Sequence, residues 1–243
     1  MISPAPLQQG DTIAIVATAR KVSQEEMLPA MDTLKNWGLN VITGKNLYKQ
    51  DNQFAGTDAE RVADFQWALD DKNIKAILFA RGGYGTVRMI DAIDFSSFQK
   101  NPKWLIGFSD ITVFHSHVHT HFGIETLHSP MAINFPKSSE EIISGIKNIL
   151  FGKPSGFNIA GSSFNRKGNA KGSVIGGNLS LLFALAGTAS DIDTHGKILF
   201  IEDLDEYLYH IDRMMMQLKR SGKLKNLAGL IRHLPQTMAG YCR

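Results

Sequence analysis

Ser109 is the side chain in this sequence best suited to nucleophilic chemistry. It stands in the run 107–112 (GFSDIT), between an apolar stretch typical of a strand and a stretch with helical spacing. Free N–H groups at the start of a helix can stabilise an oxyanion, so the run resembles a nucleophile elbow. Ile111 replaces the second glycine of the usual G-x-S-x-G pattern. Taken alone, the motif therefore favours a simple helix cap.

Two other motifs also follow strand-like stretches. Gly82 and Gly83 come after the run 74–80 (IKAILFA), and a glycine pair lets backbone N–H groups approach a ligand closely. No phosphate-binding pattern surrounds them, so a tight turn is the plainer interpretation. Glu202 ends the run 198–202 (ILFIE). A carboxylate there can orient a histidine in a serine triad, although a solvated acidic loop is commoner.

Four histidines alternate along one predicted helix, at positions 115, 117, 119 and 121. They form two i,i+4 pairs on opposite faces, whereas a zinc site needs three or four ligands that converge on one point. We therefore expect a solvated helix surface and no metal. Met214, Met215 and Met216 are interpreted as core filler.

Composition excludes several classes of protein. The 243 residues carry 26 basic and 23 acidic side chains, a net charge of +3, which is too small to indicate a nucleic-acid partner. No apolar run approaches the roughly 20 residues of a membrane span. The N-terminus has no pattern of a signal peptide, and the chain has one cysteine, Cys242. We expect a cytoplasmic protein that has no membrane partner.

Strand-like and helical stretches alternate through the first half of the chain. Strands are predicted over 12–17, 39–43, 74–80 and 104–108, and capping boxes at Ser23 with Glu26 and at Thr57 with Glu60 open two of the helices. This alternation predicts an α/β fold with a mainly parallel sheet, whose functional loops gather at the carboxyl ends of the strands. A polar stretch follows, and then a helix after Asn178, a strand over 197–201 and a helix over 207–218.

As an ordered set, these motifs resemble the LD-carboxypeptidase family, which includes muramoyltetrapeptide carboxypeptidases and microcin-immunity peptidases. The motifs are Gly10-Asp11, Arg81-Gly82-Gly83-Tyr84-Gly85, Gly107-Phe108-Ser109-Asp110-Ile111-Thr112, His128-Ser129-Pro130-Met131, Gly176-Gly177-Asn178-Leu179-Ser180, Glu202-Asp203 and Tyr209-His210-Ile211-Asp212-Arg213. The resemblance implies a Rossmann-like N-terminal domain over 1–136, a linker or domain crossing over 137–170, and a smaller, partial C-terminal domain over 171–243.

The resemblance also implies roles for residues. Ser109 is the expected nucleophile and Glu202 the triad acid. The N–H of Asp110, with one from the Gly82-Gly83 loop, forms the expected oxyanion hole. Arg81 and Tyr84 are expected to bind substrate, whereas His128 is interpreted as structural. These assignments come from the family and not from the spacing of the residues.

The expected substrate likewise comes from the resemblance. It implies removal of the terminal D-alanine from murein tetrapeptide in cell-wall recycling, by a homodimer, without a metal or an organic cofactor. A microcin-immunity type of acyl-amide peptidase is the alternative within the family. Outside it, the alternatives are a non-catalytic peptide-binding remnant and a Rossmann-like nucleotide binder, and the missing phosphate fingerprint disfavours the nucleotide binder.

One departure bears on activity. The family places its third triad member, a histidine, in a later segment resembling P-x-G-H. This sequence follows the family to Ile231 and then continues Arg232-His233-Leu234-Pro235, where the family has a Gly-rich strand end. We therefore expect the chain to be truncated at its C-terminus and to have little peptidase activity as it stands.

Overall fold

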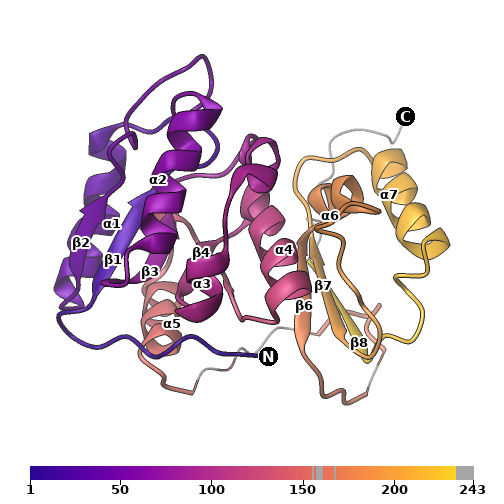
Figure 1. Cartoon of the computed structure of the whole chain (residues 1–243). Helices are drawn as coiled ribbons and strands as arrows, with labels where there is room; N and C mark the ends of the chain where they lie inside the picture. The colour runs from indigo at the N-terminus through magenta and orange to yellow at the C-terminus, as the bar shows by residue number, and fades with distance from the viewer. Residues whose placement is uncertain (155, 157–160, 167, 234–243) are drawn as a thin grey trace.

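The computed structural model describes residues 1–154, 156, 161–166 and 168–233. They form two parallel β-sheets that lie side by side, each with helices packed against it (Figure 1). The predicted α/β fold with a mainly parallel sheet and a smaller second sheet is confirmed. Among the helices of the described ranges, none is both long enough and apolar enough to span a bilayer.

The N-terminal sheet has five strands in the order β2-β1-β3-β4-β5, and all its pairs are parallel. The strands are β1 (Thr12–Val16), β2 (Asn40–Thr43), β3 (Ile74–Phe79), β4 (Trp104–Gly107) and β5 (Leu127–His128). The first four match the predicted strands, whereas β5 is too short to give a sequence pattern. The order reverses between β1 and β3, and ligands of such sheets bind at this switch point, beyond the carboxyl ends of the strands.

Helices cover both faces of this sheet. One face carries α1 (Gln24–Asn36) and α5 (Glu140–Leu150), and the other carries α2 (Asp58–Asp70), α3 (Ser96–Lys100) and α4 (Thr112–Phe122). Successive residues of β1 enter the two cores in turn, Ile13 and Ile15 on one face and Ala14 and Val16 on the other. This alternation is the two-residue period of a strand buried on both sides. Both predicted capping boxes are present, at the starts of α1 and α2.

After β3 the chain forms two short 3₁₀ turns, η1 (Thr86–Arg88) and η2 (Ile90–Ala92). One stretch differs from the prediction. The stretch 137–170, predicted as a linker, contains α5, which packs in the core of the N-terminal sheet through Ile146 and Leu150. The side chain of Ser139 caps α5 by accepting a hydrogen bond from the N–H of Ile142. The passage to the second sheet therefore starts only after Leu150.

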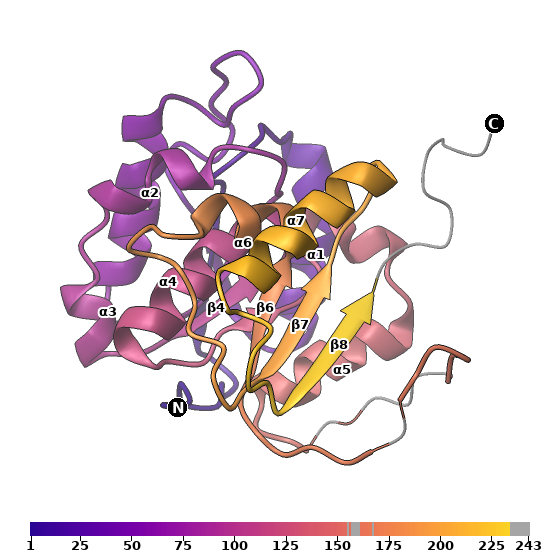
Figure 2. The same cartoon turned by 90° about the vertical axis from the view of Figure 1, so that its right-hand side faces the viewer.

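The second sheet has three parallel strands in the order β6-β7-β8. They are β6 (Val174–Asn178), β7 (Ile198–Glu202) and β8 (Gly229–His233). Figure 2 shows α6 (Leu179–Leu185) and α7 (Leu208–Arg220) together on one side of this sheet. The sequence predicted β7, α6 and α7, but it did not predict β6, whose glycines are unusual in a strand, or β8.

Helix α4 joins the two halves, and it lies between the sheets (Figure 1). At its first residue, Thr112 Oγ1 accepts a hydrogen bond of 3.0 Å from the N–H of Asn178 at the end of β6. Further along, His117 Nδ1 lies 2.9 Å from the hydroxyl of Ser190. The start of this helix, immediately after Ser109, is thus held against the end of a strand of the second sheet.

Candidate active site

Ser109 lies two residues after the end of β4, at the first position of the 3₁₀ turn η3 (Ser109–Ile111) that leads into α4. Its φ is 59°, in the left-handed region. A non-glycine residue held there costs on the order of 1–3 kcal/mol, and such strain is typical of functional sites, the nucleophile elbow among them. The turn has room for Ile111 because Gly107 has no side chain, since a Cβ at Gly107 would lie 2.8 Å from Ile111 Cγ1.

The glycine loop after β3 lies against Ser109. A Cβ at Gly82 would be 3.3 Å from Ser109 Cβ and 3.4 Å from Ser109 Oγ. Within the described part of the chain, the N–H groups of Gly82, Gly83 and Asp110 donate no hydrogen bond. The structure thus brings the predicted serine and the predicted N–H donors into one place, and these donors have no hydrogen-bond partner among the described residues.

Asp110 connects the turn to the glycine loop through its side chain. Its Oδ2 accepts a hydrogen bond of 2.9 Å from the N–H of Thr86, the first residue of η1. The carboxyl is 1% exposed, and burial raises its pKa, while the hydrogen bond from Thr86 acts in the opposite direction. This buried contact fixes the loop of Gly82 and Gly83 relative to Ser109.

Glu202 is the last residue of β7, between Asn178 of β6 and His233 of β8 in the strand register. Neighbouring strands lie about 4.8 Å apart, so Glu202 is one strand away from the Asn178 N–H that bonds to Thr112. Glu202 is 7% exposed, and its Oε1 has no hydrogen-bond partner among the described residues. Burial, helped by the nearby Asp203 carboxylate, raises the pKa of Glu202 to about 7. Glu202 therefore does not lie in a solvated acidic loop, which was the alternative interpretation of this carboxylate.

Three more side chains surround the glycine loop. Arg81 NH1 lies 4.0 Å from Glu26 Oε1. Tyr84 is 48% exposed, and its ring lies 6.0 Å from that of Phe54. The sequence analysis did not single out Arg20, whose stem lies beside Gly83: a Cβ there would be 2.7 Å from Arg20 Cδ. The signal that was available is its position shortly after β1, at the switch point of the sheet.

His115 is buried, His117 and His119 are half-buried, and His121 is exposed, so the predicted solvated surface is wrong for the first three. His115 is 6% exposed, and its Nε2 lies 2.9 Å from the carbonyl oxygen of Gly107. His121 Nε2 lies 2.7 Å from the carbonyl oxygen of Ala189. Burial lowers the pKa of His115 to about 4. In the described ranges, no three His, Cys, Asp or Glu side chains are grouped so that they could hold a metal ion.

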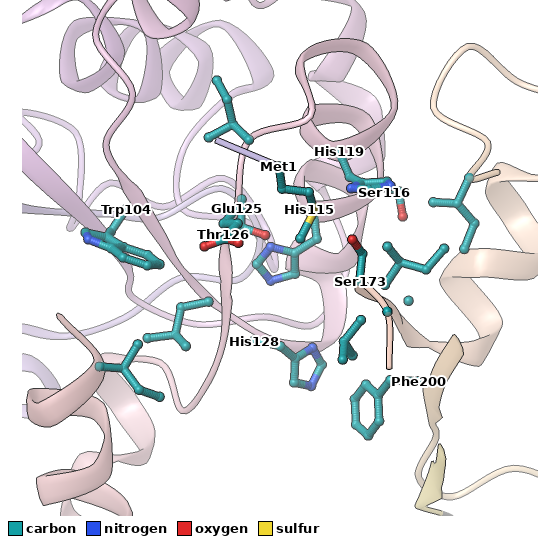
Figure 3. A pocket seen from close by; sticks show the side chains of 18 of the residues that line it. Met1, Trp104, His115, Ser116, His119, Glu125, Thr126, His128, Ser173 and Phe200 are labelled. Atoms are coloured by element: carbon teal, nitrogen blue, oxygen red, sulfur yellow. The ribbon is translucent and has the colours of Figure 1, made fainter. Parts of the chain in front are cut away.

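A cavity of about 700 Å³ lies between the two halves, next to His115 and His128 (Figure 3). Its walls include Trp104, Ser173 and Phe200, but none of the predicted catalytic or oxyanion-hole residues. The ring of His128 packs edge-on against Phe200, with centroids 5.1 Å apart. The cavity is therefore separate from the place where Ser109 meets the glycine loop.

Both halves of the chain match models of one protein family. The model of the LD-carboxypeptidase N-terminal domain matches residues 13–129, and that of the C-terminal domain matches residues 171–233. The chain belongs to the LD-carboxypeptidase family. By family, this LD-carboxypeptidase chain is a hydrolase of the serine-peptidase type, as the ordered motifs predicted.

Individual relatives agree with this assignment. The chain is 40% identical over 233 residues to a probable murein peptide carboxypeptidase of Bacillus subtilis, a match that covers 94% of this chain and 73% of the relative. It is 28% identical to the murein tetrapeptide carboxypeptidase of Pseudomonas aeruginosa, with 90% and 74% covered. Among solved structures, muramoyltetrapeptide carboxypeptidase from Oxalobacter formigenes matches with a TM-score of 0.80 at 29% identity, covering 93% of this chain and 77% of that one.

Proposed function

We propose that this LD-carboxypeptidase removes the C-terminal D-alanine from a murein tetrapeptide, with Ser109 as the nucleophile. The observation that carries the proposal is the left-handed backbone of Ser109 after β4, with Gly82 so near that a Cβ there would lie 3.4 Å from Ser109 Oγ. The substrate comes from the names of the relatives in Bacillus subtilis and Pseudomonas aeruginosa.

In the proposed reaction, Ser109 Oγ attacks the carbonyl carbon of the last peptide bond. The serine proton passes to a base and from there to the nitrogen of the departing D-alanine, which leaves an acyl-enzyme that water then hydrolyses. The N–H groups of Asp110 and of the Gly82-Gly83 loop would hold the negative oxygen that forms during attack. Their lack of other partners in the described part of the chain supports this role.

Glu202 is proposed to orient a histidine base in this reaction. The serine hydroxyl is a weak nucleophile until a base takes its proton, and a carboxylate fixes the imidazole of that base. The burial of Glu202 and its Oε1 without a described partner support the role, because a buried carboxyl oxygen needs a donor. Arg81 and Tyr84 are proposed to bind the peptide beside the glycine loop.

An acyl-amide peptidase of the microcin-immunity type is the second candidate. A structure described as an MccF-like protein from Bacillus anthracis matches with a TM-score of 0.85 at 26% identity, covering 97% of this chain. We further propose a cytoplasmic homodimer; the single cysteine supports a reducing compartment, and the family resemblance supports the dimer. Light scattering of the purified chain, against a protomer mass of 26.8 kDa, tests the dimer.

The direct experiment measures D-alanine released from murein tetrapeptide by the wild-type chain and by Ser109→Ala. We expect release by the wild type only, and the same rate with and without a metal chelator. An acyl-sulfamoyl nucleoside, supplied in parallel, tests the second candidate. Equal D-alanine release by Ser109→Ala and the wild type would refute the role of Ser109.

A further inference from the structure

Four arginines lie on or near the loops that follow β1 and β3, and they differ in their partners. Arg61 and Arg88 both pair with the carboxylate of Asp58. Arg81 has one carboxylate within reach, Glu26 at 4.0 Å, whose other oxygen already accepts the N–H of Ser23 at 2.8 Å. Arg20 is exposed and makes no side-chain hydrogen bond or ion pair to the described residues. Among these four, Arg20 is the guanidinium that has no anionic partner in the described part of the chain.

The glycine loop connects Arg20 to Ser109. Gly82 contacts Ser109, and the next residue, Gly83, contacts Arg20, whose Cγ and Cδ would lie 2.8 and 2.7 Å from a Cβ there. The Cα atoms of adjacent residues are about 3.8 Å apart, so the two contacts are close to one another. Gly83 has a φ of 116°, and its missing side chain leaves the space that the arginine stem occupies beside the loop.

A carboxypeptidase substrate has a negative charge at a fixed distance from the bond that breaks. In the last residue of a peptide, only the nitrogen and the Cα separate the scissile carbonyl carbon from the terminal carboxylate carbon. Standard bond lengths keep these two carbons within about 4 Å of each other. A cation that recognises the terminal carboxylate must therefore lie beside the nucleophile, and a guanidinium binds a carboxylate through two parallel N–H donors.

We propose that Arg20 binds the free α-carboxylate of the substrate's terminal residue and thereby restricts the enzyme to C-terminal peptide bonds. This inference rests on the proposed function, because it assigns the specificity of the same site. We assign this role to Arg20 and not to Arg81, because Arg81 already has the carboxylate of Glu26 nearby. Arg20 follows β1 and the Ser109 turn follows β4, so the two lie on opposite sides of the switch point between β1 and β3.

Binding to Ser109→Ala tests the proposal without requiring turnover. Calorimetry compares murein tetrapeptide with the same peptide ending in D-alaninamide, which lacks the negative charge. We expect the acid to bind Ser109→Ala about 10- to 100-fold more tightly than the amide, as is usual for charge-assisted pairs. Adding Arg20→Gln should weaken binding of the acid by that factor and leave the amide unchanged. Arg20→Lys should restore only part of the loss, because an ammonium lacks the planar fork.

Lys21→Gln is the matched control, because it removes one positive charge from the neighbouring residue, whose Nζ lies 3.5 Å from Gln50 Oε1. It should alter neither affinity. Equal binding of acid and amide before Arg20 is changed would overturn the role of Arg20 while leaving the proposed function intact. An equal loss of affinity for both peptides in the Arg20→Gln variant would overturn it as well. Failure of both peptides to bind Ser109→Ala, with no D-alanine released by the wild type, would reject the proposed function itself.

Discussion

The N–H of Asn178 donates a hydrogen bond of 3.0 Å to Thr112 Oγ1, and it joins the strand beside Glu202 to the helix that starts after Ser109. Thr112 is fully buried, and the Cβ of any residue at Gly177 would lie 2.5 Å from its hydroxyl oxygen. The two proposed catalytic side chains come from different sheets, so their relative position depends on this contact.

Thr112→Val should therefore impair the proposed reaction, although the substitution hardly changes the volume of the side chain. Valine fills the same space but accepts no hydrogen bond, so the buried N–H of Asn178 loses its partner at a cost of about 1–3 kcal/mol. We expect a lower Tm and a lower kcat for D-alanine release, whereas Thr112→Ser should stay close to wild type. Unchanged Tm in the valine variant would show that the contact does not hold the halves together.

Gly82→Ala tests the packing of the glycine loop on the nucleophile. The new methyl group would lie 3.1 Å from Met131 Cε and 3.3 Å from Ser109 Cβ, so the loop or the serine must shift. A shift of a few tenths of an ångström in a catalytic geometry is costly, and we expect kcat to fall at least about 10-fold. Gly145→Ala, in α5 with open space around its Cβ, is the control and should leave kcat unchanged.

Stability should fall as Glu202 ionises. Its folded pKa is about 7 against an ordinary value of 4.5, so the folded state holds the proton more strongly than the unfolded state does. The contribution of Glu202 to the free energy of unfolding is therefore constant below about pH 4.5, decreases between pH 4.5 and 7, and is smallest above that range. The full change is on the order of 3 kcal/mol.

Glu202→Gln removes this titration. Measured by denaturant unfolding, the variant should gain stability relative to the wild type between pH 5 and pH 8. A difference between the two proteins that stays constant with pH would argue that Glu202 is hydrated and has an ordinary pKa.

The identity of the base gives the fourth prediction. In the described part of the chain, no histidine is hydrogen-bonded to Ser109 or Glu202; His210, for instance, bonds to Glu206. His233 pairs in register with Glu202, the residue proposed to orient the base, so we expect His233→Ala to lower kcat for D-alanine release. An unchanged kcat in this variant would exclude His233 as the base.

The sequence predicted local features of this fold well. Each capping box depends on residues three positions apart, and β1, β3 and β4 are buried on both faces and so appear as continuous apolar runs. The sequence did not predict β6, because Gly176 and Gly177 weaken a strand pattern. These residues form a strand only through their long-range pairing with β7. Likewise, the alternating histidines of α4 indicated a solvated surface, since nothing local shows that Ser190 and Gly107 would pack against them.

The sequence predicted each motif of the candidate site separately. Only the order of the motifs along the chain indicated that they belong to one site. Ser109, Gly82 and Asp110 meet because the ends of neighbouring parallel strands meet. The pKa of Glu202 could not be predicted, because it follows from burial between β6 and β8. Arg20 was missed for a similar reason: its position beside Gly83 results from the strand order.

The contact between Gly107 and Ile111 explains how an elbow can form without the usual second glycine. The space between strand and helix is limited, and here Ile111 occupies the volume that a side chain at position 107 would need. The two positions should therefore covary among related proteins, with a bulky residue at 111 found only opposite glycine at 107. A larger residue introduced at 107 should be tolerated only together with a smaller one at 111, so the double substitution should recover stability that the single one loses.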